Sequence, residues 1–264
     1  MLHPAALVVF DLLAKKHSPQ PSFVFDPTVQ STSSDGGLSA LLPFLILFGG
    51  VALIVLVLYL GYQAKQKRRA DFVRMAVQLN LTYSAVDAFG LLGYPFTLFE
   101  RGDGRGIENV LQGAWQQTDV VAFDYWYYDE THDSKGGTSR TYHRFDCALL
   151  PMPADCARLT IERENLLTRM AGALSFKDVQ FESEEFNRAF NVKSEDKKFA
   201  SDLVDARMMQ WLIAHGTDYA FEVVGNRVLV AGPKVPPMEL IQLLGVARGF
   251  VQHVPQVVSS LYPG

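Results

Sequence analysis

The sequence predicts an α+β fold in which a single transmembrane helix precedes one domain with an antiparallel sheet and packed helices. Three observations predict it. An uncharged apolar segment is long enough to cross a bilayer, basic residues follow it directly, and the rest of the chain mixes strand-like and helical stretches that do not alternate strictly. With 264 residues, of which 48% are hydrophobic and 20% charged, the chain allows one ordinary domain plus an appendage and is not a disordered chain.

The uncharged segment is Gly36–Ala64, and its apolar centre is Leu41–Tyr62. At about 1.5 Å per residue this centre extends about 33 Å, enough to cross a hydrocarbon core of about 30 Å. It lacks the polar stripe that a buried helix of a soluble protein keeps. It also begins too late and runs too long for a cleaved signal peptide. We therefore expect a transmembrane helix over residues 39–63.

Basic residues set the expected orientation of this helix. Five of them follow the uncharged segment closely: Lys65, Lys67, Arg68, Arg69 and Arg74. On the other side, the nearest basic residues are Lys15 and Lys16. The positive-inside rule places the side that is rich in Lys and Arg in the cytoplasm. We expect a single-pass protein of the cell inner membrane, with its N-terminus outside and its C-terminal domain in the cytoplasm.

Composition and charge divide the chain into four parts. Residues 1–38 predict a flexible extracytoplasmic tail rich in Pro, Ser and Thr. Within this tail, residues 1–14 are either structured or lie before the true start of the protein. A basic juxtamembrane helix over 64–80 follows the transmembrane helix, and 81–264 form the cytoplasmic α+β domain. The formal charges of three consecutive segments differ: −1 for 1–62, +4 for 63–74 and −7 for 75–264. A basic collar therefore lies between the membrane and an acidic domain.

The basic collar has two interpretations. Lys65, Lys67, Arg68 and Arg69 are candidate contacts for anionic lipid, since each Lys or Arg near such a surface contributes about 1 kcal/mol. Alternatively, the collar only determines topology. The lipid bilayer is the expected partner, and a protein partner or a second copy of the chain are further candidates. The net charge of −4 argues against a nucleic-acid partner.

Runs of β-branched and aromatic residues predict most of the sheet. The expected strands are Leu81–Val86, Tyr94–Glu100, Ile107–Trp115, Asp119–Glu130, His143–Leu150, Arg158–Glu162, Val179–Glu182 and Asn191–Lys193. The RGDGRG run before the third of them predicts a hairpin turn, because a strand rather than a helix follows it. Pro151 and Pro153 are expected to close a strand. Two alternating apolar runs flank Gly225 and Asn226 within Tyr219–Ala231, which predicts a two-residue hairpin.

Capping residues and helical periodicity predict the helices of the domain. Glu164–Ala173 is expected to be helical. Ser194 is expected to cap a helix that begins in the run SEDKKFASDL, and Asp205 to cap another that ends at Gly216. A final helix follows Pro237, with its apolar residues at a spacing of about 3.6.

No motif for catalysis, metal binding or a cofactor is present, so none of the three is expected. The chain lacks a G-x-S-x-G elbow, its histidines have no metal-ligand spacing, and Cys147 and Cys156 carry no flanking signature. One polar cluster lies in FESEEFN, where Glu182 and Glu184 would share a strand face close to Asn187. Paired carboxylates can bind a cation or act in acid–base chemistry. The alternative is a solvated strand end.

Several runs of the sequence resemble a known family. They are Asn109–Gly113, Ala122–Tyr125, Phe181–Arg188, Val192, Ser194–Asp196, Phe199–Ala200 and Asp205–Met209. In combination they resemble an uncharacterised, mostly actinobacterial family of single-pass membrane proteins of unknown function, over most of 70–255. The resemblance implies a bacterial source, an inner-membrane setting and one continuous cytoplasmic domain. It implies no activity.

The predicted function is a membrane-tethered binding or scaffolding domain. Two alternatives stay open. One is a membrane-bound hydrolase or transferase with clustered carboxylates, in which Glu182, Glu184, Asp124 or His143 would act. The other is an anionic-lipid surface module built from the collar and the aromatic cluster Phe123–Tyr128. That aromatic cluster is otherwise expected to divide between the core and one face of the sheet.

Overall fold

The computed structural model describes residues 36–134, 136–163 and 177–263. The expectations for the tail 1–35 and for a helix at Glu164–Ala173 lie outside these residues. The chain separates into two units, one ending at Leu56 and one beginning at Val57. The architecture of the second unit is α+β, as the sequence predicts.

Helix α1, Gly36–Leu79, contains the uncharged segment and the basic collar in one continuous helix. From Ile46 onward it is long and apolar enough to cross a membrane, and the most apolar stretch is not buried. Asn80 ends it with a left-handed backbone at φ 55°, a conformation that Asn tolerates better than most residues. After Arg69 the helix changes character, because Phe72 and Met75 are buried against residues of the sheet.

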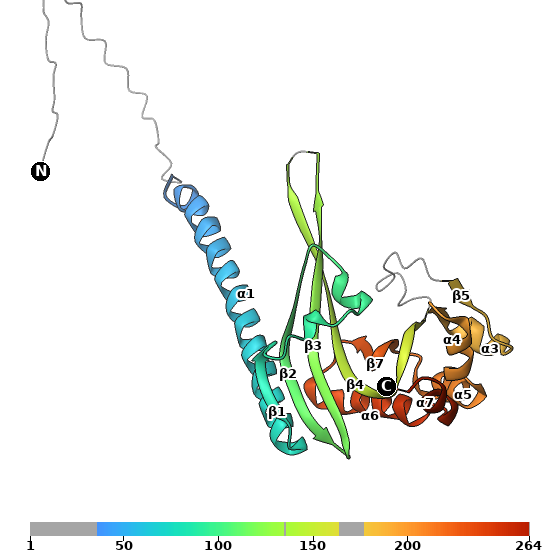
Figure 1. Ribbon diagram of the computed structural model, residues 1–264. Coiled ribbons are helices and arrows are strands. Elements are labelled where there is room, and N and C mark those ends of the chain that lie inside the picture. Colours follow the sequence, from blue (N-terminus) through green and yellow to red (C-terminus); the bar gives the residue numbers. More distant parts are fainter. Residues whose placement is uncertain (1–35, 135, 164–176, 264) are drawn as a thin grey trace, which may run out of the picture. The chain divides into compact units, whose positions relative to one another are not determined.

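Seven strands form one antiparallel sheet in the part of the chain that the structure describes (Figure 1). Their bounds are β1 Thr82–Val86, β2 Gly104–Trp115, β3 Thr118–His132, β4 Thr138–Glu162, β5 Lys177–Val179, β6 Asn191–Ser194 and β7 Ala220–Pro233. The order is β1-β2-β3-β4-β6-β5, and β7 pairs with β4. Strand β4 is therefore the centre of the domain: it pairs with β3 in its first half, with β6 near its end, and with β7 along most of its length.

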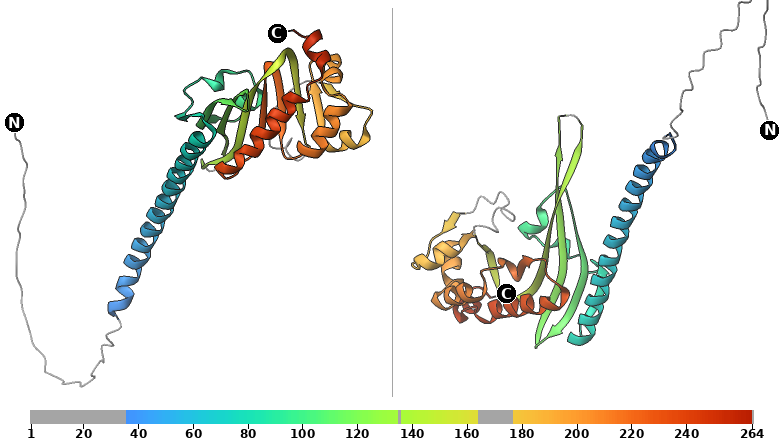
Figure 2. Two further views of the ribbon diagram at one scale, coloured as in Figure 1. Left: turned by 90° about the horizontal axis from the view of Figure 1, so that it is seen from below. Right: turned by 180° about the vertical axis from the view of Figure 1, so that it is seen from behind.

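Helices cover one face of this sheet (Figure 2). Their bounds are α3 Glu184–Ala189, α4 Lys197–Leu203, α5 Ala206–His215, α6 Leu240–Gln252 and α7 Gln256–Leu261, with a short 3-10 helix η3 at Pro237–Glu239. The end of α1 and the length of α6 contribute to one core, in which Phe72 and Leu244 share a cluster with Ala122 and Leu150. The helix predicted after Pro237 is confirmed as α6, although it is not the final one, because α7 follows it. The helix capped by Asp205 and ended by Gly216 is confirmed as α5.

The other face of the sheet packs against the segment between β1 and β2. This segment contains two 3-10 helices, η1 Leu91–Gly93 and η2 Thr97–Glu100. Phe99 lies 5.2 Å from Tyr125, ring centre to ring centre. The strand expected at Tyr94–Glu100 is therefore wrong: its apolar residues fill a core from a loop, without joining the ladder. Along β3 the aromatic cluster divides as expected, with Tyr125 and Tyr127 buried and Trp126 half-buried on the opposite face.

Two breaks that the sequence predicts in the sheet are absent. Pro151 and Pro153 do not end a strand, because β4 runs on to Glu162. The hairpin expected within Tyr219–Ala231 is absent, because residues 220–231 belong to the single strand β7. Both features have one cause: the β4–β7 register shifts on either side of the Cys156–Gly225 pair, and Gly225 adopts φ 55° there. Prolines and a left-handed glycine are accommodated at a bulge, where ladder hydrogen bonds are interrupted.

The region before α5 differs from expectation in its caps. Asp196, not Ser194, caps α4, and its Oδ1 accepts hydrogen bonds from the N–H of Lys198 at 2.8 Å and of Phe199 at 3.3 Å. Ser194 ends β6, and its hydroxyl donates to the carbonyl of Arg158 at 3.1 Å. The prediction fails because Ser194 and Asp196 are both suited to capping and lie two positions apart. Ser194 pairs with β4 as the last residue of β6, so Asp196 is the residue that caps the helix.

Candidate functional site

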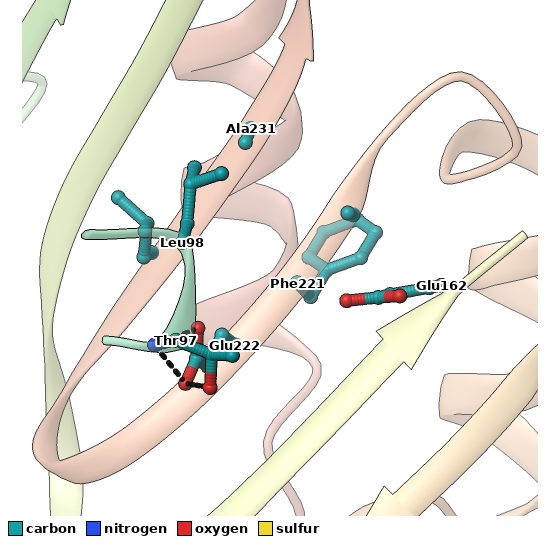
Figure 3. Close-up of a pocket in the computed structure, with 8 residues that line it drawn as sticks. Thr97, Leu98, Glu162, Phe221, Glu222 and Ala231 are labelled. Carbon is teal, nitrogen blue, oxygen red and sulfur yellow. Dashed lines mark hydrogen bonds between the residues drawn. The ribbon is translucent and has the colours of Figure 1, made fainter. Parts of the chain in front are cut away.

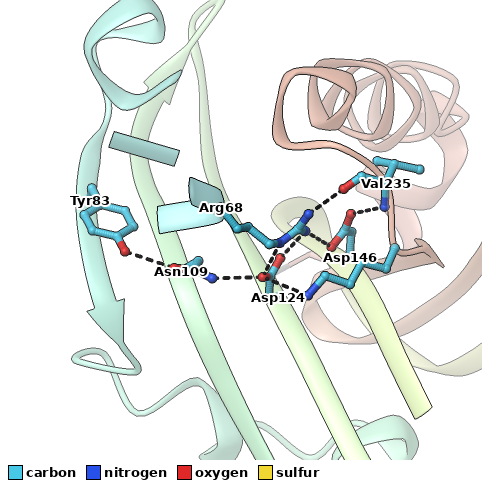
Figure 4. A network of polar contacts seen from close by, with 7 residues as sticks. Arg68, Tyr83, Asn109, Asp124, Asp146 and Val235 are labelled. Atoms are coloured by element: carbon cyan, nitrogen blue, oxygen red, sulfur yellow. Dashed lines mark hydrogen bonds and ion pairs between the residues drawn. The ribbon is translucent and has the colours of Figure 1, made fainter. Parts of the chain in front are cut away.

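A buried ion-pair network joins the basic collar of α1 to the middle of the sheet (Figure 4). Arg68 donates to both carboxylate oxygens of Asp124, from Nε at 2.7 Å and from Nη2 at 2.6 Å. Nη2 also donates to Asp146 at 2.7 Å, and Nη1 donates to the carbonyl of Val235 at 2.6 Å. The side chains of Arg68, Asp124 and Asp146 are 15%, 5% and 1% exposed. One guanidinium thus connects α1 to β3, β4 and the segment after β7.

Further polar groups complete the network. Asn109 donates to Asp124 at 2.9 Å and accepts from the Tyr83 hydroxyl at 2.9 Å. Lys234 lies 3.4 Å from Asp124, and the N–H of Val235 donates to Asp146 at 2.7 Å. Asn109 reaches this position because the β2–β3 register shifts between Glu108 and Leu111, and Asn109 adopts φ 55° there.

The two aspartates have opposite electrostatic environments. Burial alone would raise the pKa of Asp124, but hydrogen bonds from Arg68, its charge and that of Lys234 hold this pKa below its usual value. Burial raises the pKa of Asp146 to about 8, and repulsion from Asp124 adds to the rise, while the Val235 N–H and Arg68 oppose it. Two carboxyl groups in one buried site separate in this way when one arginine serves both.

These shifts predict how stability depends on pH. Unfolded aspartate has a pKa of about 3.9. Between that value and about pH 8, folded Asp146 keeps a proton that the unfolded chain has released, so the free energy of unfolding should fall as the pH rises. As the pH decreases below about 4, the free energy of unfolding should also fall, because Asp124 binds its proton more readily in the unfolded chain.

Asp146→Asn should make the upper decline shallower and leave the acid decline in place. The measurement is denaturant unfolding of the full chain in detergent micelles across this pH range. A decline above pH 4 that is equally steep in the variant and the original chain would exclude Asp146 as its source.

The residues singled out from the sequence lie in two separate places. Lys67 and Arg69 flank the partly buried Arg68 on α1, and both are exposed, as is Lys65. Glu182 and Glu184 do not share a strand face, because β5 ends at Val179 and Glu184 begins α3. The expectation of paired carboxylates on one strand is therefore wrong.

Asn187 and its neighbours form a closed turn. The Asn187 amide accepts from the N–H of Phe181 at 3.0 Å and donates to its carbonyl at 2.7 Å. Ser183 caps α3 by accepting from the N–H of Phe186, and Glu184 pairs with Arg188 at 3.1 Å. These contacts explain the polar FESEEFN run through local structure.

The other candidate chemical groups lie apart from the network. His143 lies beside Asp129 on the β3–β4 hairpin, with 3.0 Å between Nε2 and Oδ2. Cys147 and Cys156 are buried, and burial raises the pKa of both thiols. Among the described residues, no three His, Cys, Asp or Glu side chains are placed to hold a metal ion.

A second buried carboxylate fastens the loop between β1 and β2 to the sheet (Figure 3). Glu222 on β7 accepts from the N–H of Thr97 at 2.9 and 3.0 Å, and from its hydroxyl at 2.7 Å. Glu162 lines the same cavity, and burial raises its pKa to about 7. The cavity holds about 10 Å³, enough for one water molecule. It is a structural contact and too small for a ligand.

Comparisons with known proteins leave the family unassigned. No protein-family model and no curated protein matches the chain. Among solved structures, the chain is similar to the crystal structure of the mycobacterial trehalose monomycolate transport factor A, TtfA, with a TM-score of 0.49 and 14% sequence identity. The match covers 72% of this chain and 96% of that chain. A similarity at this level assigns no function, and the resemblance to an actinobacterial family stays a prediction.

Proposed function

We propose that this chain is a membrane-tethered binding or scaffolding domain whose sheet is bonded to the basic collar that follows the apolar segment. One observation carries the proposal: Arg68, which follows the uncharged segment closely on the same helix, is bonded inside the domain to Asp124 and Asp146. A collar that served only to determine topology would need no such contact. The network supports a collar that belongs to the fold of the domain.

The apolar surface of α1 supports insertion into a bilayer. Ile46, Leu53 and Leu58 are each more than 60% exposed, and their neighbours along this part of the helix are exposed too. Apolar area of this extent is unfavourable in water and favourable in hydrocarbon. The basic collar then orients the chain, with the N-terminus outside and the domain in the cytoplasm.

Binding is better supported than the hydrolase or transferase alternative. The groups named for that chemistry each have a local partner: Asp124 is held by Arg68, His143 lies beside Asp129, and Glu184 pairs with Arg188. They come from β3, β4 and α3 and do not converge. The anionic-lipid module keeps specific support, because Lys65, Lys67 and Arg69 present exposed side chains directly after the uncharged segment.

Thiol labelling tests the proposed topology. Both native cysteines are buried, so Lys67→Cys would supply the accessible thiol among the described residues. A membrane-impermeant maleimide should label this cysteine in bacterial spheroplasts only after the membrane is permeabilised. Ser34→Cys, on the other side of the apolar segment, should be labelled without permeabilisation. Labelling of Lys67→Cys in intact spheroplasts would contradict the cytoplasmic placement of the domain.

A further inference from the structure

A cavity of about 270 Å³ opens beside the Arg68 network. Its wall contains five basic side chains and two acidic ones. The basic residues are Lys65, Arg68, Arg69, Arg144 and Lys234, and the acidic ones are Glu108 and Asp124. Ala64 and Asn109 complete the lining. Arg144 comes from β4 and Lys234 directly follows β7, so the cavity gathers positive charge from segments that are distant in sequence.

Three of these cations are free to bind an anion. Arg68 is occupied by its two aspartates, and Lys234 lies 3.4 Å from Asp124. Lys65 and Arg69 are exposed and form no ion pair with any described residue. Arg144 contacts the ring of Tyr142, 5.6 Å from its centre, and likewise has no ion pair within the described ranges. Asp124 offers little repulsion to an incoming anion, because Arg68 and Lys234 already neutralise it.

The sequence places the cavity at the edge of the bilayer. Ala64 is the last residue of the uncharged segment, Lys65 is the first charge after it, and both line the cavity. When the segment spans a membrane, these two residues lie at the level of the lipid headgroups. Trp126 pairs directly with Arg144 across β3 and β4, and tryptophan favours the same level of a bilayer.

We propose that this cavity binds the phosphate-bearing headgroup of an anionic phospholipid, an inference that rests on the membrane tethering proposed above. The guanidinium groups of Arg69 and Arg144 present planar pairs of N–H donors that match phosphate oxygens, and Lys65 adds a compact charge. The ligand is a single lipid held at a defined site. General attraction between the collar and a charged surface would need neither Arg144 nor Lys234.

The test uses the full chain in phosphatidylcholine nanodiscs that contain a minor share of phosphatidylglycerol. After transfer to detergent, native mass spectrometry counts the phospholipids that stay bound. We expect one phosphatidylglycerol per chain. Arg69→Gln with Arg144→Gln should weaken its retention by about 25-fold, since each of the two removed cations contributes a factor of about five near an anionic lipid. These substitutions leave Arg68, Asp124 and Asp146 unchanged.

The matched control is Lys67→Gln with Arg74→Gln. It removes the same charge from the collar at two exposed residues that do not line the cavity, and the bound lipid should stay. Equal loss in both double variants, or retention in both, overturns the site. Glycerol 1-phosphate should not displace the lipid; displacement would overturn the lipid assignment in favour of a soluble phosphate compound.

The same experiment distinguishes a failure of membrane insertion from a failure of lipid binding. A chain that does not reconstitute into nanodiscs contradicts the proposed function before any lipid is counted. A chain that reconstitutes but retains no anionic lipid contradicts the cavity assignment alone.

Discussion

Replacing Arg68 with methionine is expected to lower the free energy of unfolding of the domain by about 3–5 kcal/mol. Methionine keeps much of the side-chain volume but leaves Asp124 and Asp146 in the core with Lys234 as their remaining nearby cation. The loss is large because a buried charge without its partner cannot recover its hydration. Four hydrogen bonds disappear together, including the one to the Val235 carbonyl.

Thermal unfolding of the full chain in detergent micelles measures this effect. For a domain of this size the expected loss corresponds to a fall in Tm of about 10 °C. Arg74→Met is the matched control, because Arg74 is 70% exposed and pairs with Asp71 at the surface. It should change the free energy of unfolding by no more than about 1 kcal/mol. Equal effects of the two substitutions would mean that the Arg68 network does not hold the domain together.

A rescue experiment separates the network from simple loss of packing. Asp124→Asn with Asp146→Asn, added to Arg68→Met, removes the uncompensated charge of Asp124 and the buried carboxyl group beside it. We expect this triple variant to be more stable than Arg68→Met alone, because a neutral amide costs less to bury than an unpaired carboxylate. Absence of any recovery would assign the loss to packing around Phe72, above which the guanidinium lies at 5.2 Å.

Local patterns predicted the parts of the fold that depend on neighbours in sequence. The uncharged segment and the collar predicted α1, and the Asp205 cap with Gly216 predicted α5. The runs at 107–115 and 119–130 predicted β2 and β3, although the strands extend a few residues further. In each case the periodicity or cap that forms the element lies inside it.

Long-range pairing decided what the sequence could not predict. Gly225 next to Asn226 is typical of a hairpin turn, yet β7 continues through it because β4 supplies the partner on one side. Pro151 would end an isolated strand, but it lies where the β4–β7 register shifts. A turn residue and a bulge residue have the same local signature, so only the partner strand distinguishes them.

The candidate site was only partly predictable. Arg68 was singled out as a lipid contact, and that role stays a prediction; the structure places its side chain against two aspartates that are 56 and 78 residues away. The sequence does contain a signal for these two aspartates. Asp124 and Asp146 each interrupt an apolar strand run, and a carboxylate buried there requires a partner. Nothing local marks Arg144 or Lys234, which join the cavity through strand register alone.

Two arginines in the centre of the apolar segment are expected to remove the chain from the membrane. Val51→Arg with Val55→Arg adds about 5–7 kcal/mol to the cost of inserting the helix, since each arginine at the centre of a span costs about 2.5–3.5 kcal/mol. The matched control places the same pair, at the same spacing, on the same helix but outside the apolar segment. Val73→Arg with Val77→Arg replaces residues that are 44% and 78% exposed, and it should not affect membrane association.

The central claim is that α1 anchors this domain in a bilayer. Flotation of membranes after a carbonate wash tests it most directly, because aggregated protein sediments while integral protein floats with lipid. The original chain and the Val73→Arg/Val77→Arg variant should float, and the Val51→Arg/Val55→Arg variant should not. Recovery of the original chain in the carbonate-soluble fraction, or flotation of all three alike, would contradict the account.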